Sequence, residues 1–168
     1  IFRVEGGEAH DWFHHGVGEG PVVSIPMARR TGFEPALYVM RGEPDYRMGA
    51  ADDTFTATWR IPAEPESEGG RRDVFSRVTV AGVPGQTAFI LSTFPDPGAH
   101  SLMVRHAGAV APFVAVHEAF FETSVVVGLR MLPGDAAAAA EVTHADGGRR
   151  LAVYESGSGP AGWGLKGR

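Results

Sequence analysis

The segment "FTATWRI" (55–61) is the clearest strand pattern in this chain. Apolar side chains occupy every second position from Phe55 to Ile61, and polar side chains occupy the positions between them. Successive side chains of a β-strand point to opposite faces, so a period of two predicts a strand with one buried face. The segment "VFSRVTV" (74–80) would place Val74, Ser76, Val78 and Val80 on one face of a strand. We therefore expect two strands here.

Similar short segments follow toward the C-terminus. They are "TAFILSTF" (87–94), "SLMVRHA" (101–107), "PFVAVHEAFF" (112–121) and "SVVVGLRML" (124–132). Proline- and glycine-containing turn signals separate several of them, and many short strands divided by turns predict an all-β, antiparallel β-sandwich. The residues expected in its core are Phe55, Trp59, Val78, Phe89, Leu91, Phe113, Val116 and Val126.

The sequence near the C-terminus predicts a β-hairpin followed by a flexible tail. "EVTHA" (141–145) and "RRLAVYES" (149–156) flank an Asp-Gly-Gly turn, which favours a tight reversal. The alanine run 136–140 is interpreted as a short helical turn or as the beginning of a strand. The polar segment 62–73 predicts a surface loop. We expect one sandwich domain over 1–156 and a flexible tail over 157–168.

Composition excludes several classes of function. The chain has 168 residues, a net charge of −5 and no cysteine. One domain is expected at this length, and neither a disulfide nor a thiolate metal site can form. A protein that binds a polyanion is usually basic, which argues against nucleic acid as a partner. No apolar run approaches the roughly 18 residues of a membrane helix, so no membrane partner is expected.

The segment "GGEAHDWFHHG" (6–16) raises the question of a metal or catalytic site. On a strand, one face carries His10, Trp12 and His14, and the other carries Asp11, Phe13 and His15. Residues four apart on a strand are separated by about 13 Å. Histidine–zinc bonds are about 2 Å long, so His10 and His14 cannot share one ion on a regular strand. Local hydrogen bonding and a contact surface for substrate or another domain remain as interpretations.

Other catalytic patterns are missing. The sequence contains no G-x-S-x-G nucleophile motif, no phosphate-binding loop and no dinucleotide-binding glycine set. Glu118 and Glu122 could form a carboxylate pair for glycoside hydrolysis, but nothing in the sequence places them across from each other. No catalytic residue is assigned.

Four segments in order resemble heparinase II/III-like polysaccharide lyases. They are "IFRVEGGEAHDWFHHG" (1–16), "DDTFTATWRI" (52–61), "PDPGAHSLMVRHAG" (95–108) and "PFVAVHEAFF" (112–121). The resemblance implies a multidomain enzyme in which an α-helical toroid precedes a long antiparallel β-sandwich. Such enzymes cleave uronate-containing polysaccharides by β-elimination, in which a base removes the proton beside the carboxylate and a cation or metal neutralises that carboxylate.

The chain resembles the later part of that sandwich, so it is expected to be an incomplete part of a larger one. The family's His-x-His-Ala-Asp element and the histidine before its Asn-Thr pair have no counterpart here. The resemblance therefore implies no cofactor in this chain, a divalent metal in a longer parent protein, and a periplasmic or secreted location. It also implies a polysaccharide and an upstream toroid as partners.

The candidates for contact with substrate or with another domain are His10, Asp11, Trp12, His14, His15, Arg105, His117 and Glu118. An open strand edge near "IFRVEGG" (1–7) also predicts self-association. Two alternatives remain: a stand-alone carbohydrate-binding module with Trp12, Trp59 or Trp163 as stacking residues, and a structural sandwich without a ligand. Trp59 lies on the apolar face of its strand, which is more typical of a core residue.

Overall fold

The computed structural model describes residues 1–31, 45–63, 72–92, 99–132, 137–155 and 163–167. In these residues every regular element is a β-strand, and every strand pair is antiparallel. No helix in the described part is long and apolar enough to cross a membrane. The chain is an all-β protein, as its period-two segments predict.

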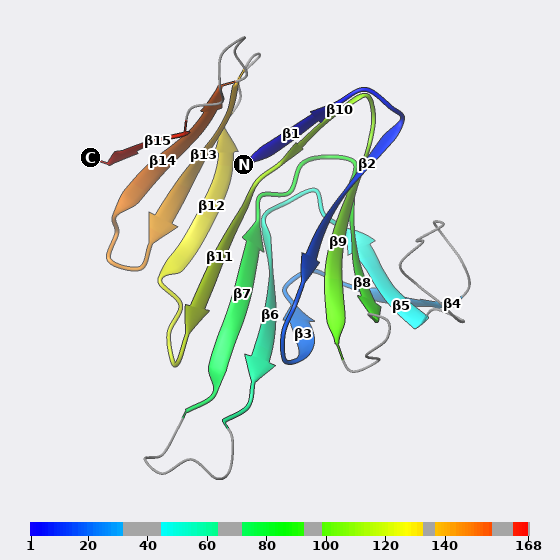
Figure 1. Cartoon of the computed structure of the whole chain (residues 1–168), viewed down its shortest axis with the longest axis vertical. Helices are drawn as coiled ribbons and strands as arrows, with labels where there is room; N and C mark the ends of the chain where they lie inside the picture. Colours follow the sequence, from blue (N-terminus) through cyan, green and yellow to red (C-terminus); the bar gives the residue numbers. More distant parts are fainter. Residues whose placement is uncertain (32–44, 64–71, 93–98, 133–136, 156–162, 168) are drawn as a thin grey trace.

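Three sheets and one two-stranded ribbon make up the fold (Figure 1). Sheet I has the order β2 (Ala9–His15), β9 (His100–Ala107), β8 (Gln86–Ser92), β5 (Asp45–Ala50) and β4 (Ala28–Thr31). Sheet II has the order β11 (Ala115–Phe120), β7 (Val74–Val80), β6 (Phe55–Ile61) and β3 (Glu19–Val23). Sheet III has the order β12 (Val126–Leu132), β13 (Ala137–His144), β14 (Arg149–Glu155) and β15 (Trp163–Gly167). The ribbon pairs β1 (Phe2–Glu5) with β10 (Val110–Phe113).

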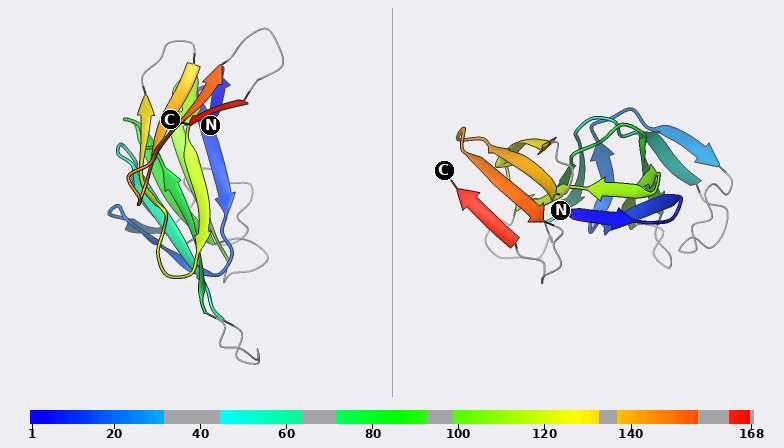
Figure 2. Two further views of the ribbon diagram at one scale, coloured as in Figure 1. Left: turned by 90° about the vertical axis from the view of Figure 1, so that its left-hand side faces the viewer. Right: turned by 90° about the horizontal axis from the view of Figure 1, so that it is seen from above.

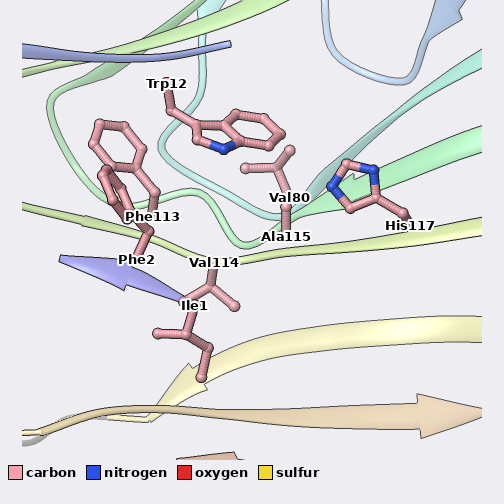
Figure 3. A pocket seen from close by; sticks show the side chains of 8 residues that line it. All are labelled: Ile1, Phe2, Trp12, Val80, Phe113, Val114, Ala115 and His117. Carbon is pink, nitrogen blue, oxygen red and sulfur yellow. The ribbon is translucent and has the colours of Figure 1, made fainter. Parts of the chain in front are cut away.

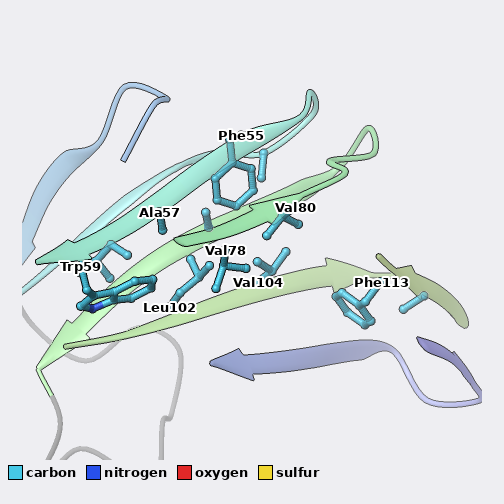
Figure 4. Close-up of a cluster of buried hydrophobic side chains, with 12 residues drawn as sticks. Phe55, Ala57, Trp59, Val78, Val80, Leu102, Val104 and Phe113 are labelled. Atoms are coloured by element: carbon cyan, nitrogen blue, oxygen red, sulfur yellow. The ribbon is translucent and has the colours of Figure 1, made fainter. Parts of the chain in front are cut away.

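Sheets I and II form the β-sandwich, and the main core lies between them (Figure 4). From sheet II the core takes Phe55, Ala57 and Trp59, the alternate positions of the stretch that predicted the fold. Leu102 and Val104 of β9 face them from sheet I. Burial of these apolar side chains is the main driving force that holds the two sheets together.

Seven of the eight residues expected in the core are buried. The exception is Val116, which is only half-buried. It packs against a separate cluster that joins sheet II to sheet III and contains Ala81, Val114, Leu129 and Ala140. Val116 lies on β11, which among the described strands pairs only with β7 and therefore forms an edge of sheet II.

Sheet III lies beside the sandwich, as Figures 1 and 2 show. The expected C-terminal hairpin is confirmed, because β13 and β14 pair from Ala137↔Glu155 to Thr143↔Arg149. The described part of the alanine run, 137–140, is strand and not helix. Its partners on β12 and β14 supply backbone hydrogen bonds that outweigh the helical preference of alanine.

Part of the expected flexible tail is a strand. Residues 163–167 form β15, which pairs with β14 from Arg150↔Gly167 to Tyr154↔Trp163. The outer edge of a strand presents unpaired N–H and C=O groups, and a nearby segment can satisfy them. Residues 157–162 and 168 of the expected tail lie outside the described residues, as does most of the expected loop over 62–73.

Candidate functional site

Strand β2 carries the histidine-rich segment at one edge of sheet I. Its two faces differ as the sequence predicts. Trp12 packs against the main core, whereas its neighbour Phe13 packs against a second cluster on the outer face of sheet I. That outer cluster contains Tyr46, Phe89, Leu91 and Met103. The alternation is regular because β2 pairs with β9 without a break in register.

The inward-facing side chains of β2 meet residues from sheet II. The ring centroids of His14 and His117 lie 4.8 Å apart, and those of His14 and Trp59 lie 5.1 Å apart. Trp12 contacts both histidines, with centroid distances of 6.4 Å to His14 and 6.1 Å to His117. We call these four residues the imidazole–indole cluster. It joins the two edge strands β2 and β11 across the open side of the sandwich.

Both histidines of the cluster favour the neutral form. Burial, and then positive charge on His117 and on His15, lowers the pKa of His14 from 6.5 to about 4. Burial also lowers the pKa of His117. The Nε2 atom of His14 is buried and has no hydrogen-bond partner in the described part of the chain. Near neutral pH the cluster therefore carries two uncharged imidazoles.

Trp59 is the most deeply buried residue of the cluster. It is fully buried, and its indole N–H donates a hydrogen bond of 3.1 Å to the carbonyl oxygen of His100. Gly16, directly after β2, lies against the same ring. A Cβ atom at Gly16 would be only 2.0 Å from Cε2 of Trp59. Glycine is required at this position because the indole occupies the space of any side chain.

A pocket of about 390 Å³ opens beside the cluster (Figure 3). Trp12 and His117 line it on the side of the cluster, and Phe2 and Phe113 line the opposite side. Its remaining lining residues are Ile1, Val80, Val114 and Ala115. Phe2 and Phe113 face each other across the β1–β10 ribbon, with ring centroids 6.3 Å apart.

Three of the candidates lie on the outer face of sheet I, away from the cluster. Arg105 donates two hydrogen bonds of 2.6 Å to the carboxylate of Asp11, its cross-strand partner. This pairing raises the pKa of Arg105. His15 Nδ1 lies 2.8 Å from Ser101 Oγ, in a hydrogen bond with its own cross-strand neighbour. These contacts stabilise the β2–β9 pairing.

The last two candidates are separated from the cluster. His10 lies opposite His106 in the β2–β9 register, near the other end of β2. Glu118 accepts hydrogen bonds from the backbone N–H groups of Val125 and Val126, at 3.0 and 3.3 Å. It also accepts one of 2.5 Å from the Ser124 hydroxyl. Glu118 therefore holds the turn between β11 and β12 and is not aimed at the pocket.

The described residues contain no group of three or more histidine or carboxylate side chains that could hold a metal ion. The cluster itself offers two imidazoles and no carboxylate. The structure brings together three predicted candidates, Trp12, His14 and His117. The other five lie outside the cluster. The structure also adds Trp59, which the sequence marked as a core residue, and the pocket wall formed by Phe2 and Phe113. The alternation of "IFRVEG" could have indicated Phe2 as a packing residue, but not its partner.

Comparison of the chain with models of known protein families finds no match, and a search of curated proteins finds none.

Proposed function

We propose that this chain is the C-terminal β-sandwich region of a heparinase II/III-like polysaccharide lyase. The parent protein would cleave uronate-containing polysaccharide by β-elimination. The present chain would form a contact surface for the substrate or for the toroid domain, and the catalytic base and the metal ligands would come from elsewhere in the protein.

The convergence of three family-like segments carries this proposal. Trp12 and His14 come from "HDWFHH" (10–15), Trp59 from "FTATWRI" (55–61) and His117 from "PFVAVHEAFF" (112–121). These segments are far apart in the chain, yet their histidine and tryptophan side chains meet in one cluster. We expect these segments to contact one another if all three resemble parts of the same family's β-sandwich.

The chemistry of the cluster fits a supporting role. A β-elimination site needs a base close to the proton beside the carboxylate and a positive group that stabilises the developing charge. His14 has a strongly lowered pKa and lies against Trp59, so it is a weak and poorly accessible base. Arg105, on the neighbouring strand β9, is already paired with Asp11.

Sequencing of the coding region upstream of Ile1 tests the proposal. We expect it to encode a helical toroid and a His-x-His-Ala-Asp element in the same reading frame. The longer protein should then release unsaturated uronate products, which absorb ultraviolet light, whereas residues 1–168 alone should release none. An unrelated upstream sequence, or turnover by the 168-residue chain, would contradict the proposal.

A stand-alone carbohydrate-binding module is the second candidate, because the half-buried Trp12 lines an open pocket. Glycan-array binding by the 168-residue chain would favour it, provided that binding is lost in Trp12→Ala. Phe13→Ala is the matched control, since Phe13 neighbours Trp12 on the same strand but points to the opposite face of sheet I.

A further inference from the structure

Within the described residues, the outer edge of β11 has no strand partner. In sheet II, β11 pairs with β7 on one side and is the last described strand on the other. The next strand, β12, follows after only five residues, 121–125, but it belongs to sheet III and pairs with β13. Two consecutive strands with so short a connection usually form a hairpin. Here they diverge and leave the edge of β11 unpaired in the described part of the chain.

The backbone groups that point out of this edge can be identified. The carbonyl oxygen of Val114 accepts a hydrogen bond of 2.9 Å from the N–H of Ala81, so Val114 points its backbone toward β7. Backbone groups alternate in direction along an antiparallel strand. The N–H and C=O groups of Ala115, His117 and Ala119 therefore point away from β7. They form a template for one further strand.

Strand β1 of the ribbon lies along the line that such a further strand would follow, because it pairs with β10, which directly precedes β11. β1 pairs with β10 in the register Phe2↔Phe113, and β10 continues through Val114 into β11. An extended segment that continued this register would have its next residues opposite Ala115, Val116 and His117. Residues directly opposite each other in an antiparallel pair point to the same face of the sheet. The side chains opposite Ala115 and His117 would thus point inward.

The pocket lies where these inward side chains would be placed. Ala115 and His117 line it, together with Ile1 and Trp12. Its volume of about 390 Å³ is far larger than the roughly 30 Å³ that one water molecule takes up. Seven of its eight lining residues are apolar or aromatic, and burial lowers the pKa of the eighth, His117, which favours its neutral form. Such a lining suits apolar side chains.

We propose that the open edge of β11 is a strand-acceptor site. Its occupant is an extended polypeptide segment that runs antiparallel to β11, continues the register of β1 and inserts apolar side chains at alternate positions into the pocket between Trp12 and His117. Main-chain hydrogen bonds to Ala115, His117 and Ala119 supply affinity, and the pocket supplies selectivity for apolar side chains. This inference does not depend on the lyase proposal.

Amide hydrogen exchange measured by NMR tests it, with the 168-residue chain and a synthetic peptide Lys-Val-Thr-Val-Thr-Lys blocked at both ends. We expect the peptide to slow exchange at the amides of Ala115, His117 and Ala119. The amides of β3, which is the opposite edge strand of sheet II and does not line the pocket, serve as the internal control. A second peptide with N-methylvaline at both valine positions keeps the inward side chains but lacks the N–H groups that would bond to β11, so it should have no effect.

Two pairs of variants complete the test. Ala119→Pro removes one outward N–H without touching the β7 ladder and should abolish the effect, whereas Ala119→Val keeps that N–H and should preserve it. Ala115→Trp fills the pocket and should also abolish the effect, even if the proline variant is poorly folded. No slowing in the unmodified chain, or equal slowing in all variants, would overturn the proposal. Slowing that rises with protein concentration without peptide would place a second copy at the edge and overturn the assigned occupant.

Discussion

The imidazole rings of His14 and His117 lie 4.8 Å apart, centroid to centroid, although they come from the edge strands of two different sheets. In the described part of the chain the two strands, β2 and β11, are not paired with each other, and these side chains bridge them. Trp12 contacts both rings, and Trp59 contacts the ring of His14. The stability of this contact should therefore depend on the charge of the histidines.

The first prediction is a loss of stability in mild acid. His14 has a folded-state pKa of about 4, below its ordinary value of 6.5, so the unfolded state binds protons more readily over this interval. The contribution of neutral His14 is complete above about pH 6.5 and decreases as pH falls toward about pH 4. Urea unfolding near neutral pH and at about pH 5 should show this decrease.

His14→Leu removes the titrating group and should reduce the loss of stability between the two pH values. His144→Leu is the control, because His144 lies on β13 in sheet III and belongs to no contact of the cluster. An identical pH dependence in His14→Leu and in the unmodified chain would contradict the assignment of this effect to His14.

The second prediction concerns the contact of Gly16 with Trp59. Gly16→Ala would place a Cβ atom 2.0 Å from the indole ring and should lower the free energy of unfolding by about 1–3 kcal/mol. Trp59→Phe removes part of that ring. The double variant should then lose less stability than the sum of the two single variants. Simple additivity, measured by urea unfolding, would show that the two residues do not compete for space.

The third prediction tests the core assignment. Phe113 is 3% exposed, and Phe113→Ala should lower the free energy of unfolding by about 3–5 kcal/mol. Phe121 is 59% exposed, so Phe121→Ala should change it by no more than about 0.5 kcal/mol. Thermal unfolding followed by circular dichroism distinguishes the two. Similar melting temperatures for the two variants would argue against the burial of Phe113.

The fourth prediction assigns a structural role to Glu118. Its carboxylate accepts hydrogen bonds from Ser124, Val125 and Val126, so Glu118→Gln should weaken the turn and cost about 1–2 kcal/mol. Glu122→Gln is the matched control, because the Arg72–Glu122 ion pair is exposed and should contribute little. Faster amide exchange at Val125 and Val126 in the first variant only is the expected result.

The fifth prediction concerns metal binding. Tight zinc sites in proteins have four ligands, or three and a water molecule, whereas His14 and His117 offer two imidazoles. The purified chain should therefore retain no stoichiometric zinc after dialysis, as measured by atomic emission. Stoichiometric zinc that is lost in both His14→Ala and His117→Ala would overturn this expectation and identify the cluster as a metal site.

Local sequence patterns predicted several strands and their faces, but not β3, β4, β5 or β15. The alternation in 55–61 predicted both the bounds of β6 and the burial of Phe55 and Trp59, because the direction of successive side chains is a local property of extended backbone. The same property placed Trp12 and His14 on one face of β2 and Phe13 on the other. The Asp-Gly-Gly turn likewise predicted the β13–β14 hairpin.

Which strands become neighbours depends on the packing of the whole chain. Nothing local to residue 14 specifies that it meets His117 and Trp59, since that contact depends on how two whole sheets pack against each other. The same reason explains why Val116 packs toward sheet III, why β11 and β12 diverge after so short a connection, and why residues 163–167 pair with β14. Side-chain alternation is set within a few residues, whereas strand order and edge partners are set by burial summed over the whole fold.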